Sequence, residues 1–223
     1  MLRRLRKKAG KVRDLDVQIA SLRNLKIARE GGQKSQLLRT LAVERAKKEK
    51  KLAATLDKDA IRLLRKRMKR VCGKLDIPAG VEPITLAFQA LSAVARDHSP
   101  LTQNTVHQYR IAGKRARYLL ELAGKDPQAQ AIIEKLKIMQ DVVGDWHDWL
   151  ILTERAEELF GGIKDSALVA AMRNLTRAKF RESVDAIVQM RPALSRESAG
   201  LRRPGEVLRK QPENARGITF AAA

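Results

Sequence analysis

The stretch VHQYRIAGKRARYLLEL at residues 106–122 has the residue spacing of an amphipathic helix with an unusual polar strip. Four polar residues recur every three or four positions and share one side of such a helix: His107, Arg110, Lys114 and Arg117. Apolar residues flank this strip on both sides, with Val106, Tyr109, Gly113, Ala116 and Leu120 on one flank and Ile111 and Leu122 on the other. Charges that lie between two apolar flanks predict a partly enclosed cationic surface, because an ordinary solvated face lies opposite a single apolar face. Such a surface requires an anion as its partner.

The composition of the chain also indicates an anionic partner. Its 223 residues contain 46 Lys and Arg against 25 Asp and Glu, which gives a formal net charge of +21 and a pI near 10.6. Such an excess favours a polyanion or membrane headgroups as the partner. Because 44% of the residues are hydrophobic, the chain can also bury a true core, which a disordered basic tail cannot.

Cysteine content and hydropathy bear on the location of the protein. Cys72 is the single cysteine, which excludes an internal disulfide framework and a cysteine-rich metal site and fits a reducing compartment. No apolar run approaches the roughly 18 residues of a membrane span, and no apolar signal-peptide core follows the basic start. We therefore expect a cytoplasmic protein.

Helical periodicity dominates the chain, so we predict an all-α fold. The predicted domains are an N-terminal helical half at residues 1–75, a C-terminal bundle at 82–197 and a partly disordered tail at 198–223. The predicted helices span residues 2–25, 35–56, 57–71, 84–97, 102–123, 127–160 and 166–191. The first of them is expected to turn Leu2, Leu5, Ala9 and Val12 toward the core.

An internal repeat relates two of these helices. Residues 2–17 align with 136–151 at a constant offset, which matches Gly10 with Gly144 and Asp14 with Asp148. Each copy has a polar strip beside its apolar seam, formed by Arg3, Arg6 and Arg13 in one copy and by Lys137, Gln140 and His147 in the other. Glycine inside a helix costs about 1 kcal/mol relative to alanine. The paired glycines therefore indicate either close helix packing or the approach of a bulky anion to bare backbone.

These motifs resemble the CHAD family, the conserved histidine α-helical domains. The resemblance covers roughly residues 1–190 and depends on HQYRIAGKRARYLLE at 107–121, LKIMQDVVGDWHDW at 136–149 and GKVRDLDV at 10–17. It implies a non-enzymatic protein that binds inorganic polyphosphate in a basic channel between two bundles, with no cofactor or metal. The family's first half opens with a His- and Arg-bearing helix that precedes the third motif. Met1 stands nine residues before Gly10, so that helix is missing from this sequence: either the start is truncated or the first bundle is incomplete, and a homodimer is one way to complete the open half.

The residue types suit a phosphate polymer. Arg110 and Arg117 supply fork-shaped donors, Lys114 a compact charge and Tyr118 a neutral hydroxyl donor. Each residue also has a purely structural interpretation: Glu121 can pair with Arg117, and His147 can tie helices together. The predicted polyphosphate-binding residues are His107, Arg110, Lys114, Arg117, Tyr118, Arg3, Arg6, Arg13, Lys137 and His147.

Three other functions fit parts of the sequence. RNA or DNA binding through the phosphate backbone is the main alternative, although aromatic residues make up only 4% of the chain and form no evident base-stacking platform. A metal-dependent phosphohydrolase is suggested by Asp141, Asp145, His147 and Asp148, but no second acidic cluster is placed to join them. Attachment to a membrane surface ranks last, because the first helix lacks an anchoring Trp or Phe.

Overall fold

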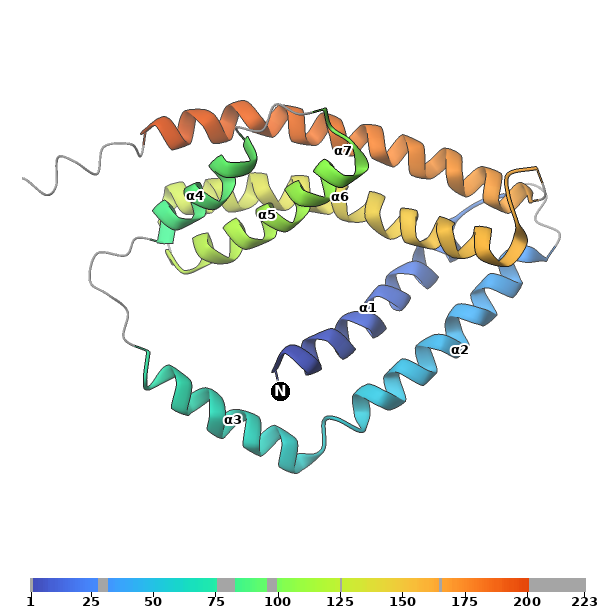
Figure 1. Cartoon of the computed structure of the whole chain (residues 1–223), viewed down its shortest axis with the longest axis horizontal. Coiled ribbons are helices and arrows are strands. Elements are labelled where there is room, and N and C mark those ends of the chain that lie inside the picture. The colour runs from blue at the N-terminus through green and yellow to red at the C-terminus, as the bar shows by residue number, and fades with distance from the viewer. Residues whose placement is uncertain are drawn as a thin grey trace, which may run out of the picture.

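The computed structural model describes residues 2–27, 32–75, 83–95, 100–124, 126–164 and 166–200, and this part of the chain contains helices and no strand (Figure 1). The predicted all-α class is therefore confirmed. The helices are α1 (Leu2–Asn24), α2 (Gln33–Ala53), α3 (Lys58–Cys72), α4 (Pro83–Ala95), α5 (Gln103–Glu121), α6 (Pro127–Phe160) and α7 (Ala167–Gly200).

Local capping fixes where several helices begin. The Asp126 carboxylate accepts a hydrogen bond from the Ala129 backbone N–H at 2.8 Å, and Pro127 follows in the first turn, so α6 begins where the sequence predicted. In the same way Asp57 caps α3, its carboxylate accepting from the backbone N–H of Ala60 at 2.6 Å. Thr102 and Thr105 form a reciprocal capping box at the start of α5.

The predicted end of the last helix at residue 191 was wrong, because α7 continues through Pro192 to Gly200. A proline removes one backbone hydrogen bond, but it need not end a helix that tertiary packing stabilises on the preceding turns. Ile187 and Met190 provide that packing, since both are buried in the core. Residues 201–223 of the predicted tail lie outside the described residues.

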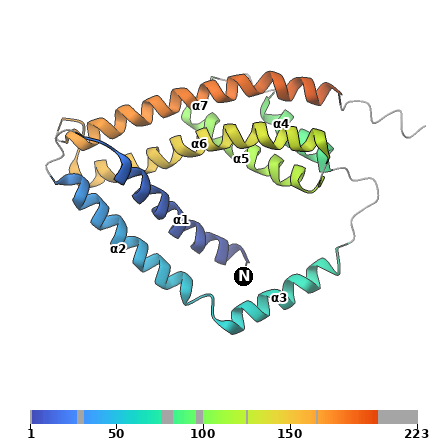
Figure 2. The same cartoon turned by 180° about the vertical axis from the view of Figure 1, so that it is seen from behind.

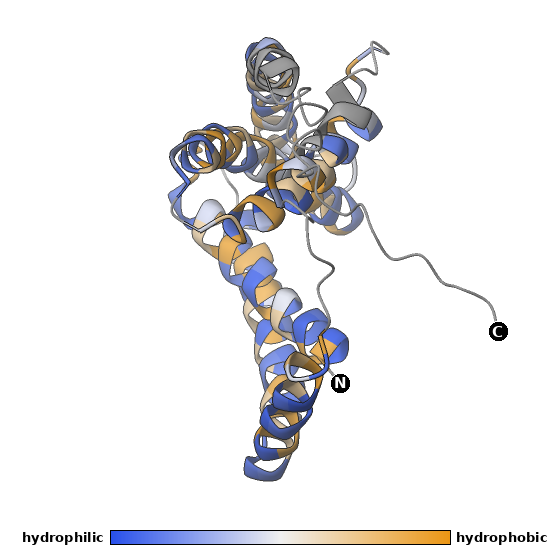
Figure 3. Ribbon diagram, turned by 90° about the vertical axis from the view of Figure 1, so that its left-hand side faces the viewer, coloured by the Kyte–Doolittle hydropathy of each residue, from blue (hydrophilic) through white to orange (hydrophobic). Residues whose placement is uncertain are grey.

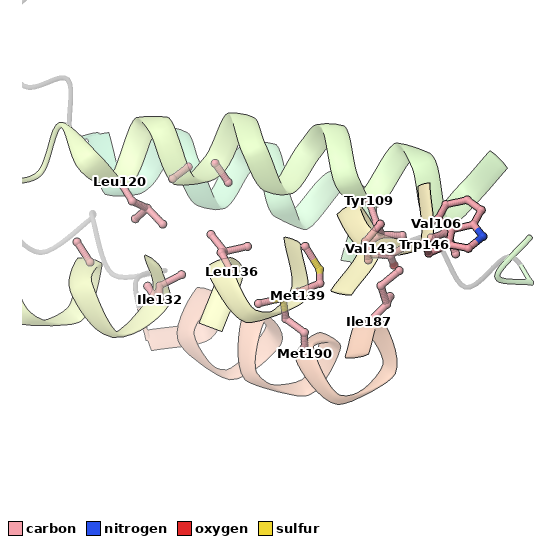
Figure 4. Close-up of a cluster of buried hydrophobic side chains, with 13 residues drawn as sticks. Val106, Tyr109, Leu120, Ile132, Leu136, Met139, Val143, Trp146, Ile187 and Met190 are labelled. Atoms are coloured by element: carbon pink, nitrogen blue, oxygen red, sulfur yellow. The ribbon is translucent and has the colours of Figure 1, made fainter. Parts of the chain in front are cut away.

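The helix α6 has 34 residues and connects two hydrophobic cores, because it contributes buried side chains to both. Its first half packs with α5 and α7 around Leu136, Met139, Val143 and Trp146 (Figure 4). Its second half, from Trp149 to Ala156, packs with α7 and with the hairpin of α1 and α2. Helices α4 to α7 thus form a bundle from which α1, α2 and α3 extend as an arm (Figures 1, 2 and 3). The predicted domain limits and the internal repeat stay predictions.

Two predicted apolar faces were wrong. In α1, Leu2 and Ala9 are exposed and burial begins at Val12, because the N-terminal half of the helix diverges from α6 (Figure 2). In α5, the flank with Val106 and Leu120 is buried as predicted, whereas the opposite flank is exposed: Ile111 by 49% and Leu122 by 72%. The cationic strip of α5 is therefore packed on one side and open on the other.

The bundle core provides the first prediction. Trp146 is 1% exposed and packs in the core shared by α5, α6 and α7, so replacing it with alanine should leave a large cavity. We expect Trp146→Ala to lower the free energy of unfolding by about 3–5 kcal/mol. Chemical denaturation followed by circular dichroism measures this loss. Leu122→Ala is the control and should change stability by less than about 0.5 kcal/mol. Equal effects of the two substitutions would contradict the described core.

Candidate functional site

The four cationic or imidazole side chains of the α5 strip are half-buried and face α6 and α1. His107, Arg110, Lys114 and Arg117 have intermediate exposure, whereas the neighbouring Arg115 is exposed. The rings of His107 on α5 and His147 on α6 lie with their centroids 5.2 Å apart. The strip predicted from spacing therefore exists as a surface at the junction of α5 and α6.

The other cations of this surface repel the charge of Lys114. Desolvation lowers the pKa of Lys114, and the charges of Arg110, Arg13 and Arg117 lower it further, while Asp148 acts in the opposite direction. Within the described part of the chain, no carboxylate lies within the 4.0 Å ion-pair distance of Arg110 or Lys114. The Nε of Arg110 is also buried without a hydrogen-bond partner. These two cations thus have donors and charge that no ion pair with a described carboxylate neutralises.

The C-terminal end of the strip is partly compensated. Arg117 Nε lies 3.3 Å from Glu121 Oε1, near enough for an ion pair but without hydrogen-bond geometry. The guanidinium of Arg117 also sits over the ring of Tyr118, 5.3 Å from its centroid. Tyr118 is 54% exposed, so it supports Arg117 from the solvent side.

A pocket of about 350 Å³ opens where α1, α2, α5 and α6 meet, next to the strip. Glu44 at its edge is already neutralised, because Arg155 lies 2.6 Å and Lys48 lies 3.5 Å from its carboxylate oxygens. Asp14 and Asp148, the aspartates matched in the sequence repeat, both reach this pocket. Its lining residues are Lys11, Asp14, Leu15, Gln18, Glu44, Lys48, Arg110, His147, Asp148, Ile151 and Arg155.

The pocket keeps His147 neutral at pH 7. Burial, together with the charge of Arg110 and the neighbouring His107, lowers the pKa of His147 to about 4. For Asp148, burial raises the pKa of the carboxyl, while Arg13 and Arg110 oppose this shift. The site thus holds a neutral imidazole whose pKa would rise if negative charge entered beside it.

The structure brings some predicted residues together and leaves others apart. Arg13 acts electrostatically on Lys114 and Asp148, although it also lies 3.4 Å from the Asp14 carboxylate. The remaining three predicted cations are exposed and are not among the residues that line the pocket: Arg3, Arg6 and Lys137. Sequence reasoning missed Lys48 and Arg155, because nothing in the spacing of their helices separates them from other surface cations.

The glycines of the repeated motif are not packing glycines. A Cβ atom built at Gly10 or Gly144 would meet no atom within 4 Å, so the close-packing explanation for them was wrong. By contrast, a Cβ at Gly113 on α5 would lie 2.7 Å from the Met139 Cε. Gly144 stands one turn before His147 and Asp148 on α6, so bare helix backbone is accessible beside the pocket.

The aspartates that suggested a phosphohydrolase do not form one cluster. Asp145 pairs with Lys179 on α7 at 3.2 Å, and Asp141 is exposed. Among the residues that the structure describes, no group of three or more His, Cys, Asp or Glu is arranged to hold a metal ion. The described helices also include none with the length and hydropathy of a membrane span.

Comparison with known proteins gives one match. The CHAD domain family matches residues 1–157, which include the α5 strip, both copies of the glycine–aspartate motif and all residues of the pocket. No curated protein and no solved structure matches the chain. Since the matched segment covers well over half of the 223 residues, the chain belongs to the CHAD domain family.

Proposed function

We propose that this protein binds inorganic polyphosphate, without catalysing a reaction on it, along the α5 strip and the adjoining pocket. The observation that carries this proposal is the uncompensated charge of Arg110 and Lys114 in a half-buried setting. An anion bound there would pair with these two cations, as a carboxylate would, and would accept a hydrogen bond from the buried Nε of Arg110. The reducing cytoplasm stays the expected location, because Cys72 is an exposed free thiol.

The shape of the strip favours a linear polymer over a single phosphate. From His107 to Arg117 the strip rises roughly 15 Å along α5, at 1.5 Å per residue. Its cations follow one another at single-turn intervals, so successive phosphoryl groups of one chain can each meet a cation. Counterion release then adds a favourable term for every phosphate neutralised, and affinity should fall steeply as salt is added.

Charge reversal tests the strip directly. Arg110→Glu with Arg117→Glu should weaken binding of long polyphosphate by about two orders of magnitude or more at physiological salt, since repulsion replaces two phosphate contacts. Helicity should be unchanged, because both side chains lie outside the apolar core. Fluorescence anisotropy with labelled polyphosphate measures the affinity, and circular dichroism the fold.

The matched control changes net charge equally at exposed positions. Arg115→Glu with Arg181→Glu removes the same charge from α5 and α7. If both double variants lost the same affinity, binding would depend on overall charge and the site assignment would fail. If RNA displaced polyphosphate at matched phosphate concentration, nucleic acid would become the better supported ligand.

Gly144 tests whether the polymer approaches the α6 backbone. Gly144→Ala should stabilise the fold by about 1 kcal/mol, because the added methyl meets no neighbour and alanine favours the helix. It should also raise the Kd for polyphosphate about tenfold, since that methyl occupies the approach to the backbone. Thermal unfolding and a binding titration measure both effects. A stabilised variant with unchanged affinity would exclude close approach at this position.

The pKa of His147 makes a pH dependence testable. In the unbound protein the native pKa, about 4, is below the ordinary value of 6.5, so the unfolded chain binds more protons between these limits and stability falls as pH falls through them. Bound polyphosphate offsets Arg110 and Lys114 and raises the pKa of His147, so affinity should rise from pH 7 toward pH 5. The charged or titratable groups that act on His147 are Arg110, His107, Asp14 and Lys114.

Isothermal titration at pH 5.5 in two buffers of different ionisation enthalpy measures this proton uptake. His147→Gln should reduce the uptake, while the contribution of Asp148 persists, because its raised pKa also moves upward near added negative charge. Proton uptake that is identical in His147→Gln and the unsubstituted protein would show that the polymer binds away from this imidazole.

A further inference from the structure

Helix α3 is the part of the arm that the polyphosphate site does not use. It has no buried residue, and it forms no packed interface with another helix in the described part of the chain. Figures 1 and 2 show it apart from the α4–α7 bundle. Several of its large apolar side chains are exposed, including Ile61 by 37%, Met68 by 46% and Val71 by 60%.

Four apolar residues of α3 share one face, three of them exposed and Leu64 of intermediate exposure. Ile61, Leu64, Met68 and Val71 follow one another at intervals of three or four, which places them on a continuous stripe. The opposite face and its borders are strongly basic: α3 contains seven Lys and Arg against one Asp, a net charge of +6 within 15 residues. Those cations are Lys58, Arg62, Arg65, Lys66, Arg67, Lys69 and Arg70.

Such a helix needs a partner for its apolar stripe. A 15-residue helix without tertiary packing is only marginally stable in water, and like charges along it add repulsion. A second copy of α3 would bring two surfaces of charge +6 together, and a phosphate polymer would neutralise the cations but leave the stripe in water. The partner must therefore combine negative charge with an apolar interior.

We propose that α3 binds in the plane of an anionic membrane surface, with its stripe in the acyl boundary and its cations on the headgroups. A large hydrophobic face, a polar face rich in Lys and Arg, and low mean hydropathy are the properties of interfacial helices. Clusters of four to eight Lys and Arg on such helices attract anionic lipid by about 1 kcal/mol for each cation near the surface. This inference is independent of polyphosphate binding, because α3 contributes nothing to the pocket.

The chain offers a specific probe and a matched control. Cys72 is its single cysteine and is exposed at the end of α3, next to the stripe, so an environment-sensitive fluorophore attached there reports insertion. Ile61→Ser with Met68→Ser removes the stripe without changing charge. Leu63→Ser is the control, because Leu63 is 43% exposed but lies among the cations of the polar face.

The experiment mixes the labelled full chain with vesicles of phosphatidylcholine alone or of equal parts phosphatidylcholine and phosphatidylserine. We expect a blue shift and co-flotation with the anionic vesicles only, a several-fold loss of both in Ile61→Ser/Met68→Ser, and little change in Leu63→Ser. Polyphosphate affinity should be equal in all three proteins. That readout also shows that the variants are folded and keeps this test separate from the proposed function.

Two results would overturn the proposal. Equal vesicle binding by the stripe variant and the unsubstituted protein would mean adhesion through overall charge alone. A blue shift that appears without vesicles, grows with protein concentration and accompanies dimers in sedimentation would show that a second copy covers the stripe.

Discussion

The half-burial of like charges on α5 is the constraint on which the rest of the structure depends. Arg110 and Lys114 are placed next to Arg13 and Arg117 in partly desolvated surroundings, an arrangement that opposes folding. Packing of the adjacent flank of α5, from Val106 to Leu120, offsets this cost, since those side chains lie fully in the bundle core. The protein thus uses part of its core stability to hold cations that an anion would neutralise.

The second requirement is a wall opposite the strip, and α6 provides it by belonging to both cores. One half of α6 is fixed against α5, and the other half holds the α1–α2 hairpin, so residues far apart in sequence converge on one pocket. Asp14 and Asp148 reach that pocket from α1 and α6. The negative charge of these carboxylates disfavours an anion deep in the pocket, so the proposed polymer should lie on the cations of the strip.

The parts predictable from sequence are those set by neighbours along the chain. The limits of α6 and the buried flank of α5 follow from capping residues and helical period, and both were confirmed. The exposed flank with Ile111 and Leu122 was not predictable, because its exposure depends on which helices pack beside α5. The roles of Lys48 and Arg155 depend likewise on the contact of α2 with α6, since both residues pair with Glu44.

Net charge alone cannot distinguish the two anionic partners proposed here, but the surroundings of the cations can. The strip cations are half-buried beside polar groups and bare backbone, surroundings that suit a hydrophilic polymer. The α3 cations are exposed around an apolar stripe, so their charge is screened within a Debye length of about 8 Å at physiological salt. The proposed membrane contact of α3 should therefore depend on burial of the stripe as well as on charge, whereas the proposed contact of α5 with a polymer should depend mainly on charge.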